Sequence, residues 1–322
     1  MVGDLTRDVL MRASEAGGEL APLIRSAGIG VIPDEEVRKA SEERGLWPGL
    51  SRGPAASGSN IEASSASRQP WVDANGFWIG WLRALHPGRP AVLAYRPNEK
   101  AGLEPDRMVP HDTLELALIE AWVSGGNYVL SLQPRFREAL LKGEARALES
   151  WKRLGATTRW LRENVSYCRQ PVVPIVTALV DSSEVTAEVV NLMYRHNVSP
   201  ALAAASSPPA PQPGSIRALV AVSLEAPPAG DVRRRILEHA AAGASVIVDA
   251  PGEKAWWRDE RLKKSREEPD REFFSLGRGQ VVAYREQISD VSEFALDVID
   301  IITQRCRAVR MWNAPTQIAL IT

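Results

Sequence analysis

The alternation of apolar and polar positions is clearest between residues 216 and 250. Residues 219–224 form a short apolar run, which is typical of a strand buried on both faces. After a break rich in proline and glycine, an amphipathic helix begins near Asp231, where a carboxylate suits the exposed backbone N–H groups. Gly243 follows the helix at a position that favours a positive φ, and residues 244–248 form a second apolar strand. This order predicts a right-handed βαβ unit in a parallel sheet.

The first half of the chain shows the same alternation. Apolar runs predict three strands, at 28–33, 90–98 and 127–132. Helical spacing predicts a helix over 5–26, either continuous or divided at Gly17 and Gly18, and further helices from 34–36 onward and around 79–85. It also predicts a helix over 114–126 with Asp112 or Thr113 as its cap, and one helix over 136–164, or two with a break at Gly155. A loop rich in Ser, Ala and Gly is predicted at 49–70, with a brief strand at 61–65. Such alternation is typical of a parallel α/β layer or of part of a β/α barrel.

The second half begins a new pattern after Pro171. Further strands are predicted at 172–181, 198–204, 279–286 and, as an edge strand, 317–322. Helices are predicted over 183–196 and from Asp290 onward, and the charged stretch 251–275 is predicted to be irregular. The change of pattern predicts two domains, residues 1–168 and 169–322.

Five segments of the second half occur in the order of a known domain. They lie within residues 172–304 and read VTALVD, VTAEVVNLMYRHNVSPAL, IRALVAVSL, VRRRILEHAAAGASVIVD and LGRGQVVAYRE. This order resembles the class I glutamine-amidotransferase-like domain, and more closely the variant known as the trimerisation domain of bacterial β-galactosidases. In that family the domain follows a β/α barrel with glycosidase chemistry. The resemblance therefore implies an α/β protein with a partial β/α-barrel-like N-terminal region, followed by a flavodoxin- or amidotransferase-like parallel-sheet domain.

The length of the first domain departs from that family. An eight-unit barrel needs about 250 residues, which is more than the chain provides before residue 169. We therefore expect either a fragment that lacks the first barrel units, or a first domain that is not a barrel.

Composition and charge narrow the range of partners. The chain has 322 residues, of which 44% are hydrophobic and 25% charged, and its net charge of −1 gives no basic excess for a nucleic-acid partner. No apolar run has the length of a membrane span, and the charged N-terminus has no signal-peptide core. We expect a cytoplasmic protein as written, unless the chain is part of a longer secreted protein. The resemblance implies carbohydrate as a partner and a homo-oligomer formed through the C-terminal domain.

The residues available for other chemistry exclude some activities. An amidotransferase needs a Cys nucleophile on a tight turn, which is expected after the strand ASVIVDA, but residues 251–254 there read PGEK. Glutaminase activity is therefore not expected, and the second domain is predicted to be structural or oligomer-forming. The four histidines share no metal-ligand spacing, so neither a metal site nor another cofactor is indicated.

Glycosidase chemistry needs two carboxylates across a sugar site. Glu99 follows a predicted strand and Asp73 lies in an aromatic-rich loop, so these two are the candidate catalytic carboxylates. Trp71, Asn75 and Arg96 are the candidate substrate-binding residues, because sugars bind to flat aromatic rings and to polar side chains. Structural explanations stay open for three of these residues: a helix cap for Asp73, a solvated loop charge for Glu99 and an internal ion pair for Arg96.

Other strand-end and helix carboxylates are weaker candidates. Residues 34–36 follow a predicted strand, but they also suit the start of a helix, and Glu115 and Glu120 lie within a helix. The sequence thus predicts a glycoside-hydrolase-like protein that cleaves O-glycosyl bonds with paired carboxylates. The alternative is a non-catalytic module that binds carbohydrate or protein, or that forms an oligomer.

Overall fold

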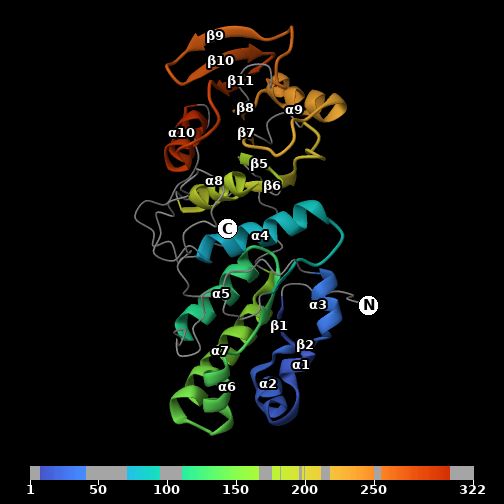
Figure 1. Ribbon diagram of the computed structural model, residues 1–322, viewed down its shortest axis with the longest axis vertical. Coiled ribbons are helices and arrows are strands. Elements are labelled where there is room, and N and C mark those ends of the chain that lie inside the picture. The colour runs from blue at the N-terminus through green and yellow to red at the C-terminus, as the bar shows by residue number, and fades with distance from the viewer. Residues whose placement is uncertain are drawn as a thin grey trace. The chain divides into compact units, whose positions relative to one another are not determined.

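The computed structural model describes residues 8–40, 71–94, 111–166, 176–181, 183–195, 198, 200–211, 218–249 and 255–304. The chain divides into two compact units (Figure 1). Unit 1 takes its described residues from the range 8–166 and unit 2 from the range 176–304. Each unit contains its own parallel sheet.

The sheet of unit 1 has four parallel strands in the order β2-β1-β4-β3. Their bounds are β1 Val9–Arg12, β2 Gly30–Ile32, β3 Val92–Ala94 and β4 Asn127–Leu130. Strand β1 pairs with β2 and β3 pairs with β4, while β1 also pairs with β4, the first strand with the last, as happens where a β/α barrel closes. Among the described residues β2 and β3 are not paired, so this sheet is open. Unit 1 is therefore a partial, β/α-barrel-like region.

One buried cluster joins all four strands of unit 1. Leu10, Ile32, Val92 and Val129 each come from a different strand, and Val37 from helix α3 packs on them. Burying each such side chain stabilises the fold by about 1.5–3 kcal/mol. The cluster gives the open sheet a common apolar interior.

The helices of unit 1 are α1 Ala13–Ala16, α2 Ala21–Ala27, α3 Asp34–Ala40, α4 Trp71–Leu85, α5 His111–Val123, α6 Pro134–Leu141 and α7 Ala145–Glu163. Helix α5 packs against both α4 and α7, and α7 also packs against α2. The contact between α7 and α2 depends on Gly155, where an added Cβ would lie 2.9 Å from the Cα of Ala27. Gly155 therefore permits a close helix approach.

The sheet of unit 2 has seven strands in the order β6-β5-β7-β8-β11-β10-β9. The parallel strands are β5 Val176–Val180, β6 Ala201–Ala204, β7 Ala218–Ala221, β8 Ser245–Val248 and β11 Gly279–Tyr284. Numbered along the chain, these five follow the order 2-1-3-4-5, which is the flavodoxin-like order. Strands β9 Lys263–Glu267 and β10 Arg271–Leu276 extend the sheet as an antiparallel hairpin.

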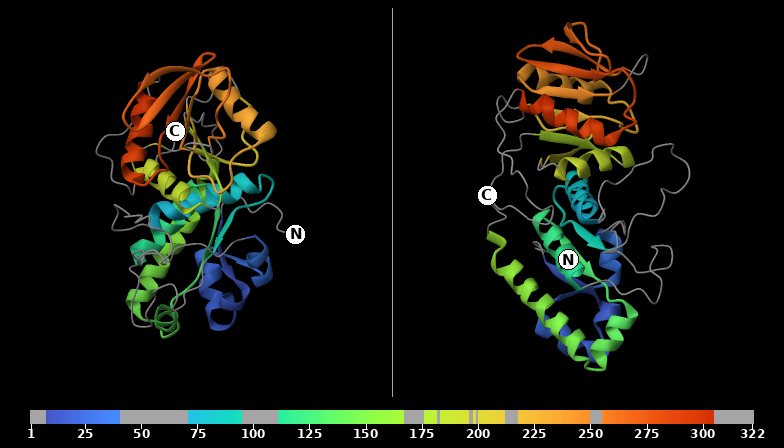
Figure 2. Two further views of the ribbon diagram at one scale, coloured as in Figure 1. Left: turned by 45° about the horizontal axis from the view of Figure 1, so that its top comes forward. Right: turned by 90° about the vertical axis from the view of Figure 1, so that its left-hand side faces the viewer.

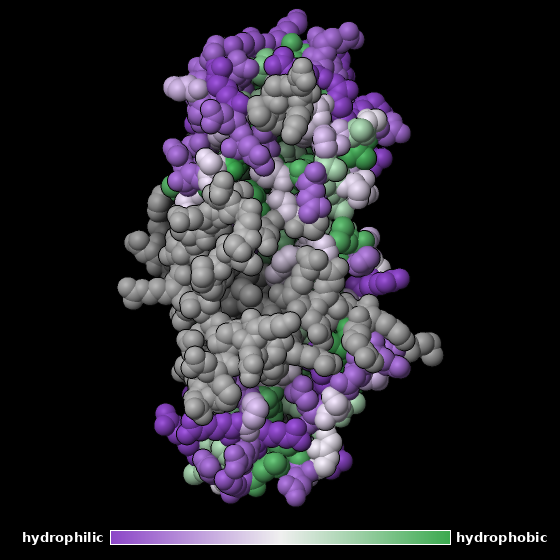
Figure 3. All heavy atoms as spheres, in the orientation of Figure 1, coloured by the Kyte–Doolittle hydropathy of each residue, from purple (hydrophilic) through white to green (hydrophobic). Residues whose placement is uncertain are grey.

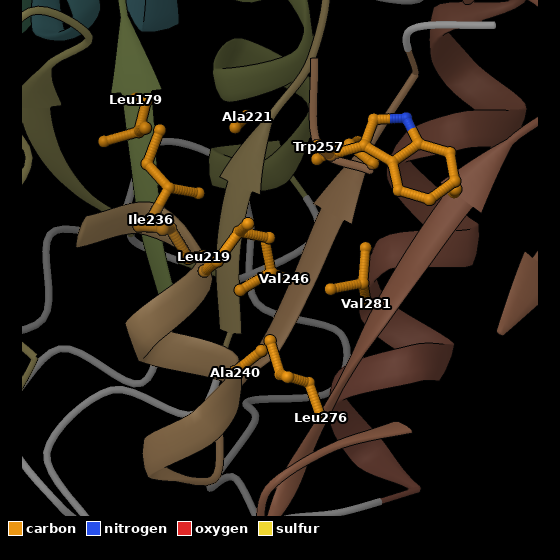
Figure 4. Packing of buried hydrophobic residues seen from close by; sticks show 12 residues of the cluster. Leu179, Leu219, Ala221, Ile236, Ala240, Val246, Trp257, Leu276 and Val281 are labelled. Atoms are coloured by element: carbon orange, nitrogen blue, oxygen red, sulfur yellow. The ribbon is translucent and has the colours of Figure 1, made fainter. Parts of the chain in front are cut away.

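Helices cover both faces of this sheet. Helices α8 Glu184–Arg195 and α10 Val291–Thr303 pack on each other on one face, and α9 Gly230–Ala242 lies on the opposite face (Figures 1 and 2). The core beneath α9 contains Leu219, Val246 and Val281 from three strands, with Ile236 and Ala240 from the helix (Figure 4). All five of these side chains are buried, which accounts for the uninterrupted apolar runs of β7 and β8.

The βαβ unit predicted from the sequence is confirmed. Strands β7 and β8 are parallel neighbours joined through α9, and Gly243 ends the helix with a φ of 119°. The predicted start of α10 is also confirmed, because the Asp290 side chain accepts a hydrogen bond from the backbone N–H of Glu293 at 2.9 Å. The predicted α/β fold class is confirmed by both sheets.

The helix predicted over residues 5–26 is wrong at its start. Residues Val9–Arg12 form strand β1, which pairs with β2 on one side and with β4 on the other. A short apolar run of this kind fits a helix or a strand by periodicity, and pairing with residues far along the chain decided the outcome.

Three further expectations are corrected. The stretch 251–275 is not irregular throughout, because it contains β9 and most of β10, where Lys264 pairs with Glu272 across the strands at 2.8 Å. The break in the helix over 136–164 lies before α7, at Gly143 with a φ of 71°, and not at Gly155. Helix α5 begins at His111, ahead of the two caps predicted for it.

The strands predicted at 61–65 and 317–322 lie outside the described residues.

The outer strand of unit 2 is strongly polar. Every residue of β9 is exposed, and the region of this hairpin is mainly hydrophilic at the top of Figure 3. A β-bulge interrupts its pairing with β10 between Phe273 and Phe274. Charges and a bulge on an edge strand disfavour pairing with the strands of other molecules.

Candidate functional site

The carboxyl ends of parallel strands are where α/β folds place their sites. Each unit has such an edge, and each edge carries polar side chains.

The predicted site residues are only partly within the described residues. Trp71, Asp73 and Asn75 lie in the first two turns of α4, and not in the loop that the sequence predicted. Arg96 and Glu99 lie outside the described residues. The roles of all five residues stay predictions.

The helix extends through the predicted loop because α5 supports it. Gly76 donates its backbone N–H to Oε1 of Glu120 at 3.0 Å. An added Cβ at Gly76 would lie 3.0 Å from Oγ of Ser124, so the glycine permits close packing of α4 on α5.

The carboxyl edge of unit 1 brings together Arg12, Ser131 and Glu15. Arg12 ends β1, and Ser131 directly follows β4, the neighbouring strand. Nη1 of Arg12 lies 3.4 Å from Oγ of Ser131, which donates to Oε1 of Glu15 at 3.0 Å. Arg12 and Ser131 are each only 1% exposed. A cation, a hydroxyl and a carboxylate thus lie together at the end of two central strands.

A second carboxylate lies at the end of the adjacent strand β2. Asp34 accepts hydrogen bonds from the backbone N–H of Ser14 at 3.0 Å and from its hydroxyl at 2.6 Å. It also begins helix α3, which agrees with the structural explanation for residues 34–36. These bonds tie the loop after β2 to the start of α1.

The arrangement around Arg12 was not predicted from the sequence. Residues 5–26 were expected to be helical, which would not have placed Arg12 at a strand end. The signal that could have found it is the run VLMR, in which an arginine ends a short apolar strand. Its contact with Ser131 joins positions 119 residues apart, and local pattern carries no information on such a pair.

The carboxyl edge of unit 2 is centred on Ser223 and Asp249. Ser223 follows β7 with a φ of 48°, and Asp249 follows β8. The backbone N–H and the hydroxyl of Ser223 each donate to the Asp249 carboxylate at 2.7 Å. Burial raises the pKa of Asp249, although the bonds from Ser223 and from the backbone N–H of Ile288 oppose this. The left-handed conformation of a serine is strained by about 1–3 kcal/mol and marks a position that its surroundings hold in place.

A second aspartate joins the loops on either side of the point where the strand order reverses. Asp181, after β5, accepts from the backbone N–H of Ser183 at 2.9 Å and of Glu225 at 2.7 Å. The hydroxyl of Thr186 on α8 donates to the carbonyl of Val222 at 3.0 Å. These bonds link the β5–α8 turn to the loop after β7, at the place where flavodoxin-like folds bind ligands.

The hydroxyl of Ser223 donates to Asp249, whereas the ring of His239 in α9 has a different partner. His239 is in the last turn of α9, where Nε2 lies 3.0 Å from the carbonyl oxygen of Pro209, and burial lowers its pKa. The turn at 251–254, where the sequence analysis expected an amidotransferase nucleophile, lies outside the described residues.

Within the described ranges, the structure shows neither a metal-binding cluster nor a membrane-spanning helix. There, no group of three or more His, Cys, Asp or Glu side chains is arranged to hold a metal ion. In the same ranges, no helix combines the length and the apolar character needed to cross a bilayer.

Comparison with known proteins adds the fold class. No protein-family profile matches the sequence, and no curated protein matches it. Among solved structures, a β-galactosidase from Rahnella sp. R3 is similar, with a TM-score of 0.52 and 11% identity over 78% of this chain and 49% of that one. A β-galactosidase from Bacillus circulans sp. alkalophilus has a TM-score of 0.52 and 10% identity, over 72% of this chain and 47% of that one.

These similarities show that this chain shares the fold of part of those two structures. At such low identity they concern the fold alone. The chain spans about half the length of the structures it matches.

Proposed function

We propose that this chain is a carbohydrate-active protein of the glycoside-hydrolase-like type, which hydrolyses O-glycosyl bonds with paired carboxylates. The observation that carries the proposal is the fold similarity to two β-galactosidases, each with a TM-score of 0.52. The parallel alternation of strands and helices in unit 1 supports it, because β/α barrels carry their active sites at the carboxyl ends of such strands.

Asp73 and Glu99 are the proposed catalytic carboxylates, with Trp71, Asn75 and Arg96 holding the sugar. In a strand–helix–strand unit with parallel strands, the helix begins on the side of the carboxyl edge. Trp71 and Asp73 belong to the first turn of α4, which precedes β3, and this order supports their assignment.

Glu15 is a further candidate carboxylate. It lies just after β1, at the carboxyl edge, and it accepts the hydroxyl of Ser131 beside the buried Arg12. A carboxylate at this edge has the chemistry that a nucleophile or a general base requires.

The test is hydrolysis of an aryl β-galactoside by purified protein and by variants. The double variant Asp73→Asn with Glu99→Gln, and separately Glu15→Gln, are compared with Glu138→Gln, whose exposed carboxylate forms an ion pair with the exposed Lys142. Loss of a catalytic carboxylate is expected to lower kcat by at least about 100-fold. Unchanged turnover in the double variant would remove Asp73 and Glu99 from the mechanism.

A non-catalytic binding or oligomerisation module is the second candidate. It is favoured by the open sheet among the described residues of unit 1. It is also favoured by unit 2, where the strained Ser223 is bonded to Asp249 rather than to a histidine. This candidate predicts saturable glycan binding, or a stable homo-oligomer by light scattering, without turnover of any glycoside.

A further inference from the structure

We propose that unit 2 carries a binding site for a neutral oligosaccharide, in a cavity beside the first turns of α9. The cavity has a volume of about 630 Å³, and its walls are α9 and the segment 258–261 after β8. This volume lies within the range of about 300–1,000 Å³ that is usual for small-molecule sites. The inference concerns a site separate from the carboxyl edge of unit 1, and it rests on this cavity alone.

One wall of the cavity contains an ion pair between Arg261 and Asp259. Nε and Nη2 of Arg261 lie 2.8 and 3.0 Å from the two carboxylate oxygens of Asp259, and the backbone N–H of Arg261 also donates to Asp259 at 3.0 Å. These bonds lower the pKa of Asp259 to about 2. The carboxylate therefore stays ionised and is held in one orientation at neutral pH.

The α9 wall contains a second set of ion pairs. Arg234 lies between Asp231, at 3.1 Å, and Glu238, at 2.8 Å. Next to it, Nε of Arg233 donates to the carbonyl of Trp256 at 2.5 Å and Nη2 donates to the carbonyl of Arg258. Arg233 thus ties the two walls of the cavity together.

The charges of the lining indicate the class of ligand. The described lining contains four arginines and four carboxylates, so their formal charges of +4 and −4 cancel. A site without net charge does not favour an anion or a cation through its overall field. It does offer many oriented N–H donors and carboxylate acceptors, which suit a ligand with adjacent hydroxyl groups that both donate and accept. Neutral sugars have that chemistry.

The experiment uses the full chain on an array of neutral galacto-, manno- and cello-oligosaccharides, with sulfated and uronic-acid counterparts and inorganic phosphate as competitor. We expect binding of at least one neutral oligosaccharide, measured afterwards by calorimetry. Arg234→Ala is expected to weaken it by about tenfold or more, since hydrogen bonds to charged groups contribute about 1.5–3 kcal/mol. Asp259→Asn is expected to weaken it in the same direction.

The matched control is Lys264→Ala. Lys264 is an exposed cation that bridges two carboxylates, Glu267 and Glu272, as Arg234 does, but it lies on β9 outside the cavity. The control should bind like the unmodified chain, and thermal melts should show all three variants folded. Retention of sulfated or acidic glycans only, equal binding by Arg234→Ala, or no neutral glycan bound would each overturn the proposal. Failure of glycoside hydrolysis would leave this site unaffected, because the two tests use different variants.

Discussion

Ser223 donates both its backbone N–H and its hydroxyl to the carboxylate of Asp249, at 2.7 Å each. The two residues follow adjacent parallel strands, so the pair fastens the loop after β7 to the end of β8. The same carboxylate lies 3.5 Å from the backbone N of Ile288, ahead of α10. One buried carboxylate therefore connects three segments at the carboxyl edge of unit 2.

Replacing Asp249 by Asn should destabilise unit 2. The amide retains one acceptor oxygen but replaces the other with an NH2 group, which cannot accept, so one of the two Ser223 donors loses its partner. We therefore expect a loss of about 1–3 kcal/mol in the free energy of unfolding. Urea unfolding measures this. Asp231→Asn, at an exposed position of α9, is the control and should change stability by less than about 0.5 kcal/mol. A neutral result for Asp249→Asn would show that the carboxylate does not hold the loops.

The contribution of Asp249 should depend on pH with a definite sign. Burial raises its pKa above the ordinary value of 3.8, so the folded protein binds a proton more tightly than the unfolded chain does. The stability of the unmodified chain, relative to Asp249→Asn, should therefore fall as pH rises from 3.8 through the folded pKa. Unfolding curves from about pH 3 to about pH 7 test this, and a relative stability that rises over this window would contradict it.

Two substitutions at Ser223 separate its hydrogen bond from its backbone strain. Ser223→Ala removes the hydroxyl bond to Asp249 and keeps a Cβ at a φ of 48°, whereas Ser223→Gly removes the same bond and relieves the strain. The backbone N–H bond to Asp249 remains in both variants. We expect both variants to be less stable than the unmodified chain, with Gly more stable than Ala by about 1 kcal/mol. Equal stability of the two variants would mean that the left-handed backbone is not strained.

Gly155 should not tolerate alanine, although alanine favours helices. The added Cβ would lie 2.9 Å from the Cα of Ala27, and overpacking of this kind costs about 1–3 kcal/mol, against a gain of about 1 kcal/mol in helix propensity. We expect net destabilisation of unit 1 in thermal or urea unfolding. Ala156→Gly, on the exposed side of α7, is the control for propensity and should cost about 1 kcal/mol. A stabilised Gly155→Ala variant would contradict the close contact of α7 with α2.

Asp290 should contribute as the N-cap of α10. Asp290→Ala removes the acceptor of the Glu293 N–H and should cost about 1 kcal/mol, because that group then has only water as a partner. Asp290→Ser restores an acceptor and should recover most of the loss. If the Ala and Ser variants unfold at the same denaturant concentration, the cap does not stabilise the helix.

The sequence determined the elements whose signals are local. Strand β7, helix α9 and strand β8 follow from apolar runs and from a glycine at a position of positive φ, and α10 follows from Asp290 and its apolar spacing. These signals depend on residues within a few positions of one another, so they are present before the chain folds. The parallel α/β class follows from their order along the chain.

The tertiary structure alone decided the features that depend on distant pairs. Residues 9–12 became a strand because β2 and β4 supply backbone partners on both sides, and the charged hairpin β9–β10 formed against β11. Arg12 meets Ser131 across 119 positions, and Ser223 meets Asp249 across 26. Periodicity reports which face of an element is buried, but it does not report which element covers that face. Both polar edges therefore arise from strand pairing, which brings the ends of adjacent strands together only after the sheet has formed.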